Sequence, residues 1–170
     1  YRKSMFYEPH MLEYIRTLGL GGTYLDVGAN VGNHAVHFEL LCPSRRVEAF
    51  EPDGFHFDIL GENLRRNALS RTRITGTATN LVGSRTIGFE ARTLDSYRFE
   101  EVSVIKADIE GMEPQFLRGA LATIARCSAG DNVVHLANKL STELVDVAGA
   151  AVVMRLLGCP GRVERAEVAQ

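Results

Sequence analysis

The chain has 170 residues, of which 45% are hydrophobic and 24% are charged, and its formal net charge is −2. This length can bury the core of one domain, and the composition is that of an ordinary globular protein. The small negative charge argues against a nucleic-acid partner, because a large nucleic-acid interface usually makes a domain basic. The sequence has no uninterrupted apolar run of roughly 18 residues, so we expect no membrane span.

The three cysteines, Cys42, Cys127 and Cys159, are widely spaced and lie among apolar neighbours. Their spacing fits neither a disulfide framework nor a zinc site, and it favours small buried side chains. We therefore expect a reducing compartment, the cytoplasm. No repeat, low-complexity tract or linker divides the chain, so we expect a single domain over residues 1–170.

The predicted elements alternate between helices and strands. A helix with one apolar face begins the chain, within a lead-in over residues 1–22 that ends in a glycine-rich stretch. We then predict a strand at residues 23–27, a helix at 31–42 and a second strand at 47–50. A helix at 57–69 and a short strand at 73–78 follow.

The second half of the chain is expected to continue this alternation. We predict a short strand at residues 87–89, a capped helical turn at 93–95 and a buried strand at 102–108. A helix at 114–124 and a fifth main strand at 132–137 follow. A last helix is predicted at 141–157 and a last strand at 162–168. Such alternation predicts an α/β fold in which a mostly parallel, Rossmann-like sheet has helices on both faces.

Two acids flank a glycine-rich turn between the first two predicted strands. Asp26 stands two residues before Gly28, Gly32 closes the turn, and Glu51 ends the second strand. In open parallel sheets, such glycines let the backbone approach a nucleoside-containing ligand, and the second acid binds the ribose hydroxyls. An Asp at the position of Asp26 suits a ligand with an ammonium group, such as the methionine end of S-adenosylmethionine.

Each of these residues has an alternative explanation. The glycines could serve only the turn, and Glu51 could be a solvated acid at a strand end. A buried carboxylate at Asp26 is costly without a cation, so we expect either a ligand or a lysine partner, for which Lys106 is the candidate. Asn30 tolerates unusual turn geometry. Phe55 either covers an adenine ring or is a core aromatic.

Three carboxylates follow one another at the end of a buried strand, at Asp108, Glu110 and Glu113. One of them could act as a general base toward a hydroxyl group, which is the interpretation we favour. The cluster could instead hold a divalent cation, with help from Asn138 or His34. It could also be a structural network in which Glu113 caps its helix.

His34 and His37 lie three residues apart and therefore on one side of the same predicted helix. His34 is in the first turn after the glycines and is a second candidate for the base. The alternative is an imidazole that packs against the sheet.

Several motifs in this order resemble one family. They are Asp26–Gly32, Ala49–Pro52, Glu62–Asn67, Thr93–Asp95, Ile105–Glu113 and Leu117–Ala120. Over residues 11–126 the chain is similar to the FkbM family of S-adenosylmethionine-dependent methyltransferases. The resemblance implies a class I methyltransferase fold and methylation of hydroxyl oxygens on sugars, glycolipids or polyketide-type compounds. The span from Gly83 to Thr93 is shorter than in the family, which allows for a missing strand, and residues 141–170 show no resemblance.

The sequence therefore predicts an S-adenosylmethionine-dependent O-methyltransferase acting on a small-molecule or glycan acceptor, without a metal. The candidate catalytic residues are Asp108, Glu110, Lys106 and His34. The candidate cofactor-binding residues are Asp26, Gly28, Asn30, Gly32, Glu51 and Phe55. A nicotinamide-dependent oxidoreductase is disfavoured by Asp26 and by the absence of a third fingerprint glycine. A non-catalytic remnant that only binds the cofactor is the other alternative.

Overall fold

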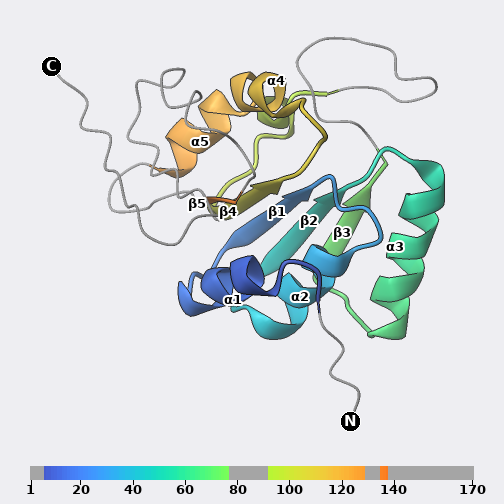
Figure 1. Cartoon of the computed structure of the whole chain (residues 1–170). Helices are drawn as coiled ribbons and strands as arrows, with labels where there is room; N and C mark the ends of the chain where they lie inside the picture. Colours follow the sequence, from blue (N-terminus) through green and yellow to red (C-terminus); the bar gives the residue numbers. More distant parts are fainter. Residues whose placement is uncertain (1–5, 77–91, 129–134, 138–170) are drawn as a thin grey trace, which may run out of the picture.

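The computed structural model of the protein describes residues 6–76, 92–128 and 135–137 (Figure 1). Five parallel strands form one sheet in the order β3-β2-β1-β4-β5. The strands are β1 Thr23–Val27, β2 Arg46–Phe50, β3 Thr72–Thr75, β4 Val102–Ala107 and β5 His135–Ala137. Since β1 lies between β2 and β4, the winding of the sheet reverses between β1 and β4.

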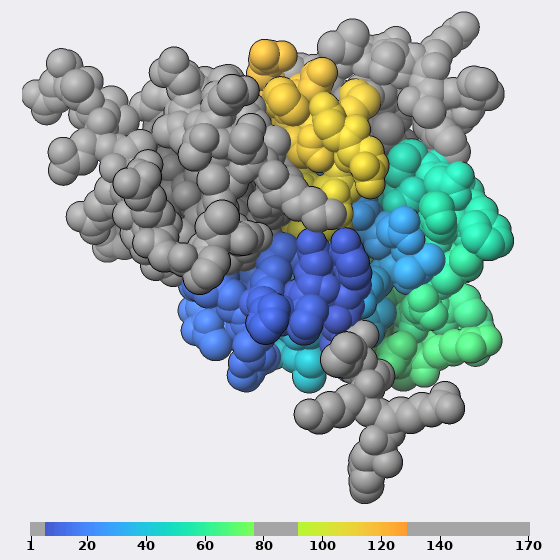
Figure 2. Space-filling model, in the orientation of Figure 1, coloured from blue at the N-terminus to red at the C-terminus, as the bar shows by residue number. Residues whose placement is uncertain are grey.

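Helices cover both faces of the sheet, as the alternation of elements predicts (Figure 1). They are α1 Pro9–Thr17, α2 Asn33–Leu41, α3 Gly54–Arg66, the 3₁₀ turn η1 Leu94–Tyr97, α4 Glu113–Arg118 and α5 Leu121–Cys127. Helices α1, α2 and α3 lie on one face, and α4 and α5 lie on the other. In the space-filling view, the atoms of α1 are dark blue and those of α3 are teal to green (Figure 2).

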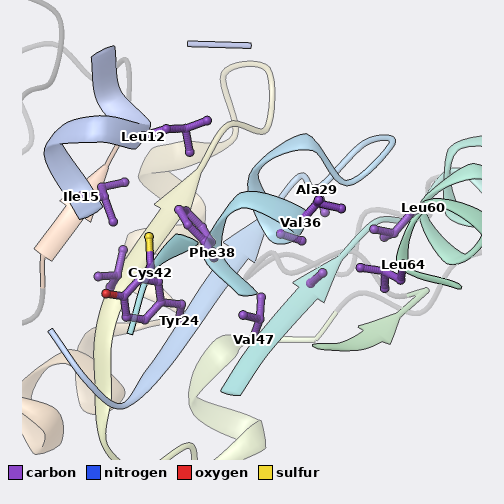
Figure 3. Close-up of a cluster of buried hydrophobic side chains, with 13 residues drawn as sticks. Leu12, Ile15, Tyr24, Ala29, Val36, Phe38, Cys42, Val47, Leu60 and Leu64 are labelled. Atoms are coloured by element: carbon purple, nitrogen blue, oxygen red, sulfur yellow. The ribbon is translucent and has the colours of Figure 1, made fainter. Parts of the chain in front are cut away.

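Each face of the sheet has its own hydrophobic core. The first core packs residues of α1, α2 and α3, among them Leu12, Phe38 and Leu60, against the strands (Figure 3). The second core joins η1, α4 and α5 to the opposite face, through residues such as Phe50 and Phe116. A fully buried side chain of this size stabilises the fold by about 1.5–3 kcal/mol. Together the two cores fix the sheet, and the sheet in turn fixes the loops that follow the ends of its strands.

The described cysteines match their prediction. Cys42 belongs to the first core and Cys127 to the second, and both are buried free thiols. Cys159 lies outside the described residues.

The predicted helix over residues 114–124 is wrong in one respect, because the structure divides it into α4 and α5. The N–H of Gly119 bonds to the carbonyls of Gln115 and Phe116, which tightens the last turn of α4. The Gly119 carbonyl accepts a hydrogen bond from the N–H of Asp95 instead of continuing the helix. The Asp95 carboxylate then accepts from the N–H groups of Ala122 (3.1 Å) and Thr123 (2.7 Å), so α5 begins as a new, capped helix.

Two further boundaries differ from the prediction. Helix α3 ends at Arg66 rather than near Leu69, because Ala68 adopts a left-handed conformation and the N–H of Leu69 bonds back to the Leu64 carbonyl. The predicted turn at residues 93–95 is η1, but the Thr93 side chain makes no capping bond. The strand predicted at 87–89, the helix at 141–157 and the strand at 162–168 lie outside the described residues.

Candidate functional site

The carboxyl ends of β1, β2 and β4 meet at one edge of the sheet. In the strand register, Val27 pairs with Phe50 on one side and with Ala107 on the other. The next residues along these three strands are Gly28, Glu51 and Asp108, so the glycine turn begins between the two acids. Ligands of open parallel sheets bind at this edge, where the winding reverses.

The glycine turn, residues 28–32, is held tightly against its neighbours. Gly28 and Gly32 have φ angles of 75° and 88°, and the N–H groups of Gly28 and Ala29 share the Phe50 carbonyl at 3.0 and 2.9 Å. A Cβ atom at Gly28 would overlap the carbonyl oxygen of Asp108, and one at Gly32 would overlap the Leu60 side chain. Gly28 is therefore required by the close approach of the backbone at Asp108. At Gly32, the end of the Leu60 side chain can move, so the positive φ is the stronger constraint.

Glu51 ties the glycine turn to the end of β2. Its side chain is buried, and one carboxylate oxygen accepts the N–H of Asn30 at 2.7 Å while the other accepts the N–H of Asp53 at 2.9 Å. Asn30 adopts the left-handed conformation expected of it, with a φ of 49°. Each oxygen of Glu51 keeps a second lone pair with which it can accept another hydrogen bond.

A residue without a predicted role also holds this turn. The Asn63 side chain, in the middle of α3, donates to the Val31 carbonyl at 2.7 Å. Asn63 belongs to one of the motifs of the family resemblance. Its polar amide within an otherwise amphipathic helix is the sequence feature that could have indicated its contact with the turn.

The lysine partner considered for Asp26 is present in the structure. Asp26 and Lys106 are 0% and 3% exposed, and the Lys106 Nζ lies 3.0 Å from Asp26 Oδ1. The same ammonium donates to the Gly28 carbonyl at 2.7 Å. Among the described residues, neither oxygen of Asp26 has a hydrogen-bond donor beyond this ion pair.

His34 is buried in the first turn of α2, where it contacts the segment before α1. Its Nε2 lies 3.3 Å from an Oε2 of Glu8, and its ring makes an edge contact with that of Tyr7. Burial lowers the pKa of His34, and the nearby Lys106 ammonium lowers it further, although the carboxylates of Asp26 and Glu8 oppose this. His34 is therefore mostly neutral at pH 7.

Glu8 is a partner of His34 that the sequence did not reveal, since no motif precedes Pro9. The segment is held in place by reciprocal hydrogen bonds, in which the Tyr7 N–H donates to Asn33 Oδ1 (2.9 Å) and the Asn33 amide donates to the Tyr7 carbonyl (3.1 Å).

The three carboxylates after β4 do not converge on one point. Asp108 is half-buried, and its N–H bonds to the Val27 carbonyl at 3.0 Å, which keeps it beside the glycine turn. Glu110 is exposed in a left-handed turn, and Glu113 accepts the N–H of Ile109 at 3.1 Å. Glu113 therefore holds the turn before α4, and it does not cap its helix as one alternative had it. Within the described ranges, no three His, Cys, Asp or Glu side chains gather as a metal site.

Phe55 is not a core aromatic, which corrects one of its two interpretations. It stands in the first turn of α3 and is 71% exposed. A large apolar ring four residues after Glu51 is accessible to a ligand. No helix in the described part of the chain is long and apolar enough to cross a membrane.

Comparisons with known proteins agree with this architecture. The family model of the methyltransferase FkbM domain matches residues 53–130. The methyltransferase FkbM from Methylobacillus flagellatus KT is similar to the chain with a TM-score of 0.55 and 26% identity, over 62% of this chain and 31% of that one. The present chain therefore spans about a third of that protein. No curated protein matched the sequence.

Two more distant structures support the fold alone. The precorrin-6y C5,15-methyltransferase from Geobacter metallireducens GS-15 aligns with a TM-score of 0.52 and 13% identity, over 79% of this chain and 64% of that one. An rRNA methylase from Streptococcus thermophilus aligns with a TM-score of 0.51 and 16% identity, over 77% and 71%. The fold is that of the class I methyltransferases. The family model and the solved FkbM structure together confirm the resemblance to FkbM methyltransferases that the motifs predict.

Proposed function

We propose that this protein binds S-adenosylmethionine and methylates a hydroxyl oxygen of a sugar or another small molecule or glycan. The observation that carries the proposal is the register of the three strand ends. It brings Glu51 and Asp108 to either side of Gly28, at the edge of the sheet where ligands of this fold bind. The match to the FkbM family model and the FkbM structure supports the same activity.

The residues at this edge fit a nucleoside with an amino-acid tail. Glu51 can accept both ribose hydroxyls while it keeps its bonds to the backbone, and the exposed ring of Phe55 can cover an adenine. The glycine turn offers close backbone approach for the tail, with Asn30 at its tip. The chemistry supplied by bound S-adenosylmethionine is an activated methyl group on a sulfonium.

The contribution of the protein is to orient the acceptor and to remove one proton. Asp108, half-buried beside Gly28, is our candidate for the general base that takes the proton of the acceptor hydroxyl. Glu110 stands at the exposed rim and is the candidate to orient the acceptor. His34 is neutral, so it could also take a proton, but it lies deeper and is packed against aromatic rings.

Calorimetric titration with S-adenosylhomocysteine and with NAD tests the proposal. We expect S-adenosylhomocysteine to bind and NAD not to bind. NAD binding alone would favour an oxidoreductase and overturn the proposal. Binding of S-adenosylhomocysteine without methyl transfer to a broad panel of hydroxyl compounds would favour a non-catalytic remnant.

The Asp108→Asn variant tests the base. The amide keeps the size of the side chain but cannot take up a proton, so turnover should fall about 10²–10⁴-fold while affinity for S-adenosylhomocysteine changes little. Equal turnover by the variant and the wild type, in a methyl-transfer assay with an accepted substrate, would remove Asp108 from the mechanism.

A further inference from the structure

The ammonium of Lys106 joins three parts of the candidate site. It comes from β4, it pairs with Asp26 of β1 at 3.0 Å, and it donates to the carbonyl of Gly28 at 2.7 Å. Asp26 and Lys106 are direct neighbours in the register of the two strands, so their side chains lie on the same face of the sheet. The contact with Gly28 extends this pair to the start of the glycine turn.

Burial makes the two side chains dependent on each other. They are 0% and 3% exposed, and a single charge at such depth is strongly disfavoured unless an opposite charge compensates it. Lys106 is thus the cation that the Asp26 carboxylate requires, and Asp26 is the counter-charge that lets an ammonium lie beneath the turn. The pair is electrically neutral as a unit.

The structure already supplies Asp26 with a cation from its own chain. Its side chain is fully buried, and the nearest cation is already Lys106. Lys106 also donates to the Gly28 carbonyl and so fixes the position of the first residue of the glycine turn. Because Gly28 lies against the Asp108 carbonyl, a displaced turn would also move the segment that carries the candidate base.

We propose that Asp26 and Lys106 are positioning residues, which form one neutral buried unit that holds the Gly28 carbonyl and thereby the glycine turn. Asp26 acts on the donor through this turn and not by contact with the donor's amino group. The inference rests on the proposed function, because it concerns how the same site holds S-adenosylmethionine. It assigns Lys106 a role in positioning instead of in the proton transfer.

The first experiment compares two ligands that differ only in the amino group. S-adenosylhomocysteine and its desamino analogue are titrated into the wild type and into Asp26→Asn. If Asp26 acts through the turn, the variant loses about tenfold in affinity for both ligands alike. A loss confined to S-adenosylhomocysteine would show direct contact with the amino group and would overturn the proposal.

A matched control comes from the other face of the sheet. Glu48 of β2 is also a buried acid, 1% exposed, and its register partner Leu25 belongs to the second core. Glu48 pairs with Arg46, and burial raises the pKa of Glu48 while the cations of Arg46 and Arg73 oppose this shift, so an amide here also removes the charge of a buried, paired acid. Glu48→Gln should leave the affinity for both ligands unchanged. An equal loss in this variant would mean that any buried acid of the sheet affects binding, which would contradict a specific role of Asp26.

The second experiment measures the pair without any ligand. Urea unfolding is followed for Asp26→Asn, Lys106→Met and the double variant. Each single variant leaves one buried charge without its partner, so we expect both to be less stable than the double variant. If a single variant does not fold, a double variant that does fold would likewise show that the unpaired charge caused the loss of stability. Losses that simply add in the double variant would overturn the pairing.

The two experiments separate this proposal from the proposed function. A wild type that binds no S-adenosylhomocysteine would overturn the proposed function, and with it the positioning of a donor. Unfolding would still decide whether Asp26 and Lys106 act as a unit. A folded double variant with wild-type affinity for S-adenosylhomocysteine would leave the proposed cofactor site intact but overturn the role of the pair in holding the turn.

Discussion

Glu51 combines two tasks in one carboxylate. It accepts two backbone N–H groups, from Asn30 in the glycine turn and from Asp53 before α3, and it is our candidate for binding the ribose hydroxyls. A buried carboxylate with fixed donors is already oriented before a ligand arrives, so little order has to be gained on binding. Its loss should therefore affect both the turn and the ligand.

We expect Glu51→Ala to weaken binding of S-adenosylhomocysteine by ~1–3 kcal/mol, because the ribose hydroxyls lose their acceptor. Isothermal titration calorimetry measures the change. Glu13→Ala is a suitable control, since Glu13 is an exposed acid of α1 that pairs with Arg16 and has no place in the proposed site, and it should bind like the wild type. An unchanged dissociation constant for Glu51→Ala would remove Glu51 from the site.

Two glycines of the site allow a matched comparison of backbone strain and steric overlap. Gly28 and Gly111 both have left-handed φ angles, of 75° and 87°, but only Gly28 has another chain segment against it. Gly111→Ala should cost about 1–2 kcal/mol of stability from the conformation alone. Gly28→Ala should cost clearly more, because its methyl group meets the Asp108 carbonyl. Urea unfolding of both variants checks this, and equal losses would contradict the close approach.

At the scale of elements, short helices depend on capping groups that come from elsewhere in the chain. Helix α5 has only seven residues, which is too short to be stable by itself in water. Asp95, from the separate turn η1, accepts two N–H groups of its first turn. The contact also joins η1 to the break between α4 and α5, so one residue organises three elements.

Replacing Asp95 by Ala should destabilise the protein by ~0.5–2 kcal/mol, as the loss of a helix N-cap does. Thermal and urea unfolding measure the effect. The Asp95→Asn variant keeps one accepting oxygen and should lose less than Asp95→Ala. Full stability of Asp95→Ala would mean that α5 needs no cap from η1.

At the scale of the whole molecule, buried histidines make stability depend on pH. Burial lowers the pKa of both His34 and His37 from the ordinary 6.5. Below that pH these two histidines bind protons in the unfolded chain but remain largely unprotonated in the folded protein. The free energy of unfolding therefore falls as the pH decreases through 6.5. The loss stops once the pH is below the lowered pKa of the folded state.

The His37→Leu variant should therefore lose less stability than the wild type when the pH is lowered from about 7.5 to about 5.5, because one of the two histidines no longer titrates. Urea unfolding at both pH values measures the difference. Burial raises the pKa of Glu48, which acts in the opposite direction, but this contribution is common to both proteins and cancels in the comparison. Identical pH dependence would contradict a titrating His37.

Much of this architecture follows from sequence patterns alone. The spacing of apolar residues and of glycines predicted the alternating strands and helices, the turn at residues 28–32 and the acids at the ends of β1, β2 and β4. These features are local, since periodicity, turn chemistry and strand length depend on neighbouring residues. The parallel sheet followed because alternating strands and helices leave few other arrangements.

The partners of individual side chains were decided only by the tertiary structure. Strand order and register bring Lys106 to both Asp26 and the Gly28 carbonyl, and the packing of α3 leaves Phe55 exposed. No local pattern determines these contacts, because each depends on how segments far apart in the chain are brought together. The sequence by itself thus determined which residues stand at the edge of the sheet, and the packed fold decided which of them face one another and which remain accessible to a ligand.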